Sequence, residues 1–320
     1  MRGLSSQQVS HFQTEGYLVV KGLFDPAADI DPVIAEYAGV LDRLADGLFA
    51  SGQIASRYEE LSFSQRLIKI QQETGKNFTQ HFDFSLPQSN IKSDTPIWLG
   101  EAVFNILRNE RLLDAVESII GSEIYANPVQ HVRLKMPESA IPQNMGGNVR
   151  TTPWHQDNAV VTEDADETQM ITVWFPLWDA PISAGPLKIV PRSHIVGLRP
   201  HCPSHAGMQI PEKLLDEEQI LAVPLKRGDA LFMQKLTCHS SLPNHSSNIR
   251  WSFDLRYHPV GQATGRASFP GFVARSRTAP ESELHDHDVW ANEWLAARAR
   301  LAVDAPKAFH RWDANAPVCA

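Results

Sequence analysis

Residues 249–257 read IRWSFDLRY, and polar and apolar side chains alternate along this run. Arg250, Ser252, Asp254 and Arg256 are the polar members, and aromatic or aliphatic residues stand between them. Because successive side chains of a β-strand point to opposite faces of its sheet, the run predicts a strand with one polar and one apolar face. In an ordinary sandwich the polar face would meet water. In a barrel it would line the interior, where Arg250 could hold a carboxylate through two parallel hydrogen bonds beside the Ser252 hydroxyl.

Other short runs of strand-like composition surround this stretch from about residue 124 onward. Turn residues such as Gly185-Pro186 and Gly228-Asp229 separate them, and no helical pattern lies between them. Many short strands without intervening helices are typical of an antiparallel sandwich or barrel, so we predict a mainly β, jelly-roll-like core with flanking helices. The predicted strands are EIYANPVQHVRLKM, PWHQDNAVV, QMITVWFPLWDA, GPLKIVP, ILAVPLKRGDALFMQ and IRWSFDLRYHP.

The rest of the chain flanks this core. Residues 1–122 have mainly helical periodicity, and residues 261–320 form an extension with a further helical run, DVWANEWLAARARLAV. No internal repeat or low-complexity tract divides the chain, so we expect a single domain whose β-barrel core spans about 123–260. Two loops, 74–98 and 199–221, exceed ordinary connection lengths, and long ordered loops on a β-scaffold often act as lids.

The composition argues against several classes of partner. The 320 residues are 42% hydrophobic with a net charge of -8, and the basic residues are scattered, so neither nucleic acid nor an anionic membrane is an expected partner. The first residues lack the apolar core of a secretory signal, and nowhere do eighteen apolar residues run together. We expect a cytoplasmic protein that acts on a small-molecule substrate. Nothing in the sequence indicates the oligomeric state.

The cysteines suggest no cross-link. Cys202, Cys238 and Cys319 are an odd number at wide spacing, which makes neither a disulfide framework nor a cysteine-based zinc site. We therefore expect reduced, mostly packed thiols.

The run PWHQDN, residues 153–158, contains a histidine and an aspartate two positions apart. If the run is a strand, His155 and Asp157 project from the same face and can reach one ion. His239 ends the apolar run GDALFMQKLTCH, where a later strand of the same barrel is expected. Two histidines and one carboxylate would form a facial triad with open positions, the arrangement of non-haem Fe(II) oxygenases.

Other histidines compete for this role, since the chain has 13 of them. The HFD run that begins at His81 repeats the spacing, but it lies in a helical or looped region with no suitable partner strand. The HDHD run that begins at His285 could chelate zinc, although its acidic residues suit the start of the last helix better. His201 and His205 lie in a loop and could contact either substrate or solvent.

Six stretches over most of residues 5–277 share a wider pattern: GYLVVKGLF, WHQDN, GPLKIVPRSH, GDALFM, CHSSLPNHSSNIRWSFDLRY and FPGFVARSR. Together they resemble the phytanoyl-CoA dioxygenase family of Fe(II)- and 2-oxoglutarate-dependent oxygenases. In that family an arginine eleven residues after the distal histidine binds the far carboxylate of 2-oxoglutarate, and Arg250 follows His239 at this spacing. The resemblance therefore implies that His155, Asp157 and His239 bind Fe(II) and that Arg250 anchors 2-oxoglutarate.

The resemblance also implies a double-stranded β-helix, or cupin-like, core. It makes Ser252 a helper hydroxyl and places Gln130, Lys135 and Trp174 on strands that flank the co-substrate, where each could equally be core or surface. The implied reaction consumes 2-oxoglutarate and O2, releases succinate and CO2, and hydroxylates an unactivated C–H bond of a small organic molecule. Asp157 stands where halogenases of this family have a small residue, so hydroxylation is favoured over halogenation.

Other functions fit part of the pattern. The same site could catalyse desaturation, cyclisation or epimerisation of a natural-product intermediate, because the outcome depends on how the substrate lies. An intact triad with Arg250 argues against a catalytically silent metal-binding module, and a zinc hydrolase would leave Arg250 without a role. No basic cluster marks a coenzyme A binder, and family membership alone does not establish that activity.

Overall fold

The computed structural model describes residues 3–143, 145–146, 149–204, 207–304 and 311–319. No helix in these ranges is long and apolar enough to cross a membrane. The helices are α1 (Ser6–Glu15), α2 (Asp31–Ala50), α3 (Phe63–Thr74), α4 (Glu101–Leu107), α5 (Glu110–Ile120) and α6 (His287–Val303). The strands are β1 (Tyr17–Val20), β2 (Glu123–Ala126), β3 (His131–Lys135), β4 (Ile171–Pro176), β5 (Leu187–Ile189), β6 (Cys202–Ser204), β7 (Gly207–Gln209), β8 (Leu221–Val223), β9 (Ala230–Gln234), β10 (His239–Ser241), β11 (Arg250–Pro259) and β12 (Phe272–Ser276).

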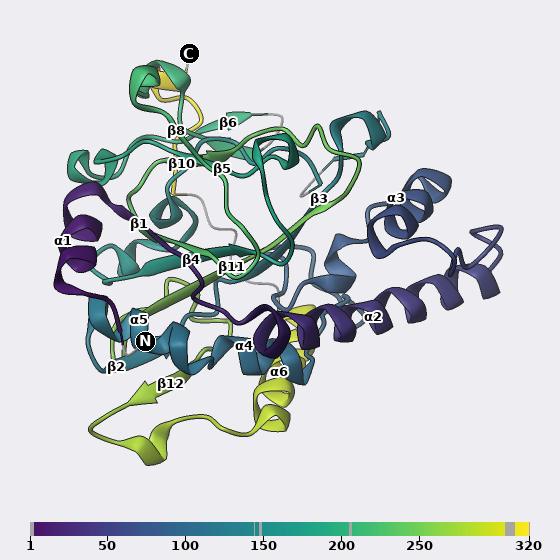
Figure 1. The fold of residues 1–320 in the computed structure, drawn as a ribbon, viewed down its shortest axis with the longest axis horizontal. Coiled ribbons are helices and arrows are strands. Elements are labelled where there is room, and N and C mark those ends of the chain that lie inside the picture. The colour runs from purple at the N-terminus through teal and green to yellow at the C-terminus, as the bar shows by residue number, and fades with distance from the viewer. Residues whose placement is uncertain (1–2, 144, 147–148, 205–206, 305–310, 320) are drawn as a thin grey trace.

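Two antiparallel sheets form the core. The larger sheet has the strand order β1-β9-β4-β11-β2-β12, with β3 also paired to β11, and the smaller sheet has the order β10-β5-β8. Figure 1 shows α2, α4, α5 and α6 on one side of the larger sheet and the smaller sheet on the other. The hairpin of β6 and β7 lies within the 199–221 segment. The predicted fold class, mainly β with flanking helices, is confirmed.

The larger sheet is organised around β11, whose side chains are buried on both faces. On the helical side, Trp251 and Phe253 contact the ring of Tyr37 in α2, with centroids 5.2 and 6.1 Å apart. On the opposite side, Arg250 and Arg256 line a cavity together with residues of the smaller sheet. The polar face of this strand is therefore interior, as the barrel alternative predicted.

Two details of the predicted core are wrong. The described strands do not close into a barrel, because those of the smaller sheet are short and form no ladder with the larger one. The run PWHQDNAVV is not a strand: it makes one bridge at His155 and then a 3-10 turn, Asp157–Val160. Pairing stops there because the Asn158 N–H donates to the Lys235 carbonyl at 3.1 Å and the Ala159 N–H donates to the Gln156 carbonyl at 3.0 Å.

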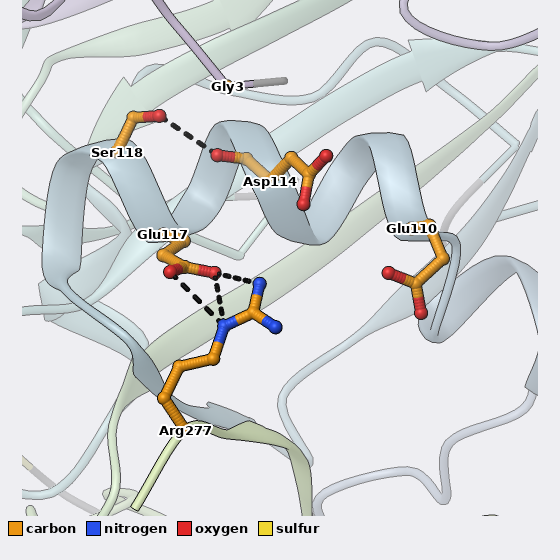
Figure 2. A pocket seen from close by; sticks show the side chains of 6 residues that line it. All are labelled: Gly3, Glu110, Asp114, Glu117, Ser118 and Arg277. Carbon is orange, nitrogen blue, oxygen red and sulfur yellow. Dashed lines mark hydrogen bonds and ion pairs between the residues drawn. The ribbon is translucent and has the colours of Figure 1, made fainter. Parts of the chain in front are cut away.

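Charged side chains attach the C-terminal extension to the helical part. Arg275 of β12 is buried and binds three carboxylates of α5, those of Glu110, Asp114 and Glu117. Figure 2 shows the neighbouring Arg277, which reaches Glu117 across a surface pocket. These pairs fix β12 beside β2 at the edge of the larger sheet.

The expectation of three reduced cysteines is also wrong. Cys202 of β6 and Cys319 form a disulfide with Cα atoms 5.4 Å apart, whereas Cys238 is buried and free. The two partners are separated by 117 residues, so their proximity depends on the tertiary fold and leaves no local pattern in the sequence. The bond ties the C-terminal residues to the 199–221 segment.

Candidate metal centre

A backbone bridge brings two histidines together. His155 and His239 exchange both backbone hydrogen bonds, at 2.9 and 3.0 Å, and their ring centroids lie 4.1 Å apart. Each ring places Nδ1 2.9 Å from the carbonyl oxygen two residues earlier, of Pro153 and of Thr237. A carbonyl accepts only from a protonated Nδ1, so the Nε2 lone pair of each ring is free to bind a metal.

Asp157 completes the group from the start of the 3-10 turn. Its Oδ1 lies 3.8 Å from Nε2 of His155 and 3.9 Å from Nε2 of His239. One donor atom from each of the three residues fits within 4.8 Å, and no other such group of three is found among the described residues. Donors about 2.1 Å from a common ion are at most about 4.2 Å apart, so a small inward movement would close the group on a metal.

The protonation states also suit a metal. Burial, followed by the neighbouring His239, lowers the pKa of His155 to about 3, so this ring is neutral at physiological pH. Burial alone would raise the pKa of Asp157, but Arg256 and the two histidines outweigh it and hold this pKa below its usual range. Metal ligands must be deprotonated. Two imidazoles with one carboxylate are the donor set of non-haem Fe(II) sites.

Both carboxylate oxygens of Asp157 have partners that orient them. Arg256 of β11 donates from Nη2 to Oδ1 at 2.5 Å, and Thr172 of β4 donates from its hydroxyl to Oδ2 at 2.5 Å. Arg256 is itself fixed by a hydrogen bond from Nη1 to the Val129 carbonyl at 2.7 Å. Partners of this kind orient a ligand before the metal arrives.

An arginine without an anionic partner lies on the same cavity. Arg250 is buried, lies over the Trp174 ring at 5.4 Å, and donates from Nη1 to the Ser252 hydroxyl at 2.8 Å. Trp174 donates from its indole nitrogen to the same hydroxyl at 3.0 Å. Burial, followed by Arg133, lowers the pKa of Arg250 to about 9. Asp254 lies near enough to oppose this shift, but among the described residues no carboxylate forms an ion pair with Arg250, and a buried cation of this kind favours the binding of an anion.

The other two predicted co-substrate residues lie farther back. Lys135 stands opposite Arg250 in the pairing of β3 with β11 and donates to the Arg150 carbonyl. Gln130 is buried and donates from Nε2 to the Asn127 carbonyl at 2.5 Å. Neither is among the residues that line the cavity. Their contact with 2-oxoglutarate stays a prediction.

One small cavity between the two sheets joins these groups. One residue that lines this cavity, Arg133, was not predicted from the sequence; its guanidinium binds Asp254 at 3.2 and 3.3 Å. The available signal was its position two residues before Lys135, on the same face of a predicted strand. The cavity is lined by Arg133, Thr152, His155, Thr172, Trp174, Leu187, Met233, His239, Arg250, Asp254 and Arg256.

The competing histidines lie elsewhere. His81 lies in a 3-10 turn, and the nearby Asp83 instead binds the His131 ring at 2.9 Å. The HDHD run starts the last helix, where the Asp286 side chain accepts the first backbone N–H groups. His201 is buried, accepts the backbone N–H of Gln156 and does not line the cavity. His205 falls outside the described residues.

Comparison with known proteins gives the family. The family model "Phytanoyl-CoA dioxygenase (PhyH)" matches residues 12–252. The chain belongs to this family. The resemblance read from the sequence motifs is therefore confirmed.

Two curated relatives of this family member are both named 1-deoxypentalenic acid 11-beta-hydroxylase. The Streptomyces exfoliatus protein is 33% identical over 125 residues, which cover 36% of this chain and 43% of the relative. The Streptomyces arenae protein is 29% identical over 162 residues, which cover 47% and 54%. The chain therefore matches about half the length of these relatives.

Solved structures show the same fold. The non-haem monooxygenase ThoJ in its apo form has a TM-score of 0.58 at 18% identity, covering 93% of this chain and 100% of that chain. EvdO2 from Micromonospora carbonacea var. aurantiaca has a TM-score of 0.51 at 18% identity, covering 80% and 91%. At these identities the likeness concerns the fold alone.

Proposed function

We propose that this family member is an Fe(II)- and 2-oxoglutarate-dependent dioxygenase that hydroxylates an unactivated C–H bond of a small organic acid, with release of succinate and CO2. One observation carries the proposal. His155, His239 and Arg250, which forms no ion pair among the described residues, line the same cavity, and Asp157 lies beside the two histidines. A metal site and an anion site are thus within reach of one small chelating molecule.

Each residue has a defined task in this proposal. His155, Asp157 and His239 hold Fe(II), which with bound 2-oxoglutarate supplies the activation of O2. Arg250 binds the far carboxylate of 2-oxoglutarate with the planar fork of its guanidinium, beside the Ser252 hydroxyl. The Trp174 ring supports the guanidinium from one side, at 5.4 Å.

The walls of the cavity keep water away from the reacting groups. Leu187 of β5 and Met233 of β9 line it from the two sheets, and both side chains are buried. Exclusion of water strengthens every charge interaction inside and protects the reactive centre from side reactions. The 199–221 segment remains the predicted lid.

The charges around the cavity favour an acidic substrate. Three arginines, Arg133, Arg250 and Arg256, line the cavity, against two nearby carboxylates, Asp157 and Asp254. A divalent metal and the dianion 2-oxoglutarate offset each other, so positive charge would remain. Burial and the neighbouring arginines lower the pKa of Lys135 well below its usual range, so a further anion would stabilise its charged form.

The names of the relatives point the same way, since 1-deoxypentalenic acid is a carboxylic acid. The proposal is tested with this acid and its methyl ester as probes, measuring succinate formed with Fe(II), O2 and 2-oxoglutarate. Iron-dependent turnover of the acid, with at least tenfold lower kcat/KM for the ester, would support it. Equal rates for acid and ester would contradict the acidic substrate class. Succinate release that does not depend on Fe(II) would contradict the enzyme assignment.

The cytoplasmic location stays a prediction. Stable disulfides are rare in reducing compartments, so the Cys202–Cys319 bond weighs against it.

A further inference from the structure

The segment that carries Asp157 belongs to neither sheet. Pairing ends at the single bridge of His155 with His239, and the chain then forms 3-10 turns at Asp157–Val160 and Glu163–Ala165. Arg256 and Thr172 hold the carboxylate of Asp157, but neither bonds to the backbone of the turn. The position of this ligand therefore depends on contacts made by residues 158–166.

Arg311, near the C-terminus, supplies several of those contacts. Its Nη1 donates to the carbonyls of Asn158 at 3.1 Å and Val161 at 3.3 Å, and its Nη2 bonds to both carboxylate oxygens of Asp166 at 2.6 and 2.5 Å. The Asn158 side chain donates to the same Asp166 carboxylate at 2.8 Å. Only 6% of the Arg311 side chain is exposed. One buried guanidinium thus spans the segment that follows the metal-ligand position.

Trp312 reaches both sides of Asp157 along the chain. Its indole N–H donates to the Ala159 carbonyl at 3.2 Å, and its ring lies 4.8 Å from the ring of His201. His201 in turn accepts the backbone N–H of Gln156 at 3.1 Å, immediately before Asp157. The C-terminal residues therefore bracket the ligand position, directly on one side and through His201 on the other.

The disulfide holds this tail in place. Cys202 directly follows His201, and its bond to Cys319 closes the far end of the C-terminal segment. Arg311, Trp312 and Cys319, here called the tail residues, all lie beyond residues 12–252, the part of the chain that matches the family. The tail is therefore a feature that family membership does not explain.

We propose that Arg311 and Trp312 are positioning residues for Asp157, and that the Cys202–Cys319 disulfide keeps them in contact with its segment. The inference rests on the proposed role of Asp157 as a metal ligand. Removing a group that orients a metal ligand typically lowers metal affinity by 10- to 100-fold. We expect Arg311→Ala to weaken metal binding by about tenfold, because the turn loses its charged clamp while Asp157 keeps Arg256.

The probe is Co(II), titrated into metal-free protein and followed by its visible absorption. Arg311→Lys should recover part of the affinity, because an ammonium can pair with Asp166 but cannot also span both carbonyls. Arg277→Ala is the control: it removes a more exposed arginine–carboxylate pair from the same C-terminal extension, at a pocket separate from the metal cavity. It should bind Co(II) like wild type.

The outcomes separate this inference from the proposed function. Wild-type affinity in Arg311→Ala would overturn the positioning role while leaving the metal site intact. An equal loss in Arg277→Ala would show general destabilisation and would also overturn it. Wild-type protein that binds no Co(II) would contradict the metal site itself, and this inference with it.

The tether is tested by Cys319→Ser. If the disulfide holds the tail, Co(II) should be released to EDTA several-fold faster than from wild type, because the tail can leave the Asp157 segment. An unchanged release rate would overturn the role given to the disulfide.

Discussion

Arg256 and Asp157 form an ion pair inside the protein, with Nη2 2.5 Å from Oδ1 and with 3% and 1% of their side chains exposed. The same carboxylate oxygen lies within 3.9 Å of Nε2 of His155 and of His239. The arginine thus balances the charge of the carboxylate and holds its Oδ1 near the Nε2 atoms of both histidines. Because Arg250 and Arg256 share β11, one strand positions both the proposed metal ligand and the proposed co-substrate anchor.

Replacing Arg256 should therefore affect the metal-free protein most. Arg256→Met leaves the Asp157 carboxylate buried without its partner, which typically costs about 3–5 kcal/mol of unfolding free energy. A bound metal would restore an opposite charge, so the deficit should shrink when Co(II) is added. Urea denaturation of wild type and variant, with and without Co(II), measures this. The same deficit under both conditions would contradict the shared role of Oδ1.

The two histidines should be required for metal retention. His155→Ala and His239→Ala each remove one of three donors, so we expect loss of stoichiometric Fe(II) binding in anaerobic dialysis with the circular dichroism of a folded protein. His81→Ala is the control, since it removes the histidine of the other His-x-Asp run and should retain the metal. Iron retained by His155→Ala but lost by His81→Ala would show that the wrong run was assigned.

Local patterns predicted much of this site. Alternation along β11 predicted one polar and one apolar face and left open whether the polar face is wet or interior; all side chains from Arg250 to His258 are buried. The spacing of two between His155 and Asp157 also placed both residues in one cluster, although a bridge and a turn position them instead of a strand. The His-x-Asp spacing predicted this cluster correctly because two side chains two residues apart can approach one another in more than one backbone conformation.

Contacts between distant segments were not visible in the same way. Cys202 and Cys319 are 117 residues apart, and Arg311 meets Asp166 across 145 residues. Neither pair has a periodicity or spacing that a single sequence reveals. For Arg133 the sequence offered only its position on the same strand face as Lys135, and its bond to Asp254 follows from the pairing of β3 with β11.

Acid should destabilise the fold through His258. This side chain is buried, and burial lowers its pKa from 6.5 to about 4. The unfolded chain therefore takes up a proton at higher pH than the folded protein does. The stabilisation is complete above pH 6.5 and is lost as the pH falls toward 4, by up to about 3 kcal/mol.

The measurement is urea denaturation at pH 7.5 and at pH 4.5. His258→Gln has no such proton to take up, so it should lose less stability than wild type between these two values. His155 and His201, whose pKa values are also lowered, remain in both proteins and serve as a common background. Parallel losses in the two proteins would contradict the role of His258.

The central claim is that one cavity holds both a metal and 2-oxoglutarate, with Arg250 as the anchor. Anaerobic mixing of wild-type protein with Fe(II) and 2-oxoglutarate should produce the visible metal-to-ligand charge-transfer band of a chelated 2-oxo acid. Arg250→Ala should still bind Fe(II) but need far more 2-oxoglutarate, because losing a buried charge partner costs about 2–5 kcal/mol, or roughly thirty- to several-thousand-fold in affinity. Arg250→Lys should recover only part. A band that titrates in Arg250→Ala as in wild type, or that never forms in wild type, would contradict the account.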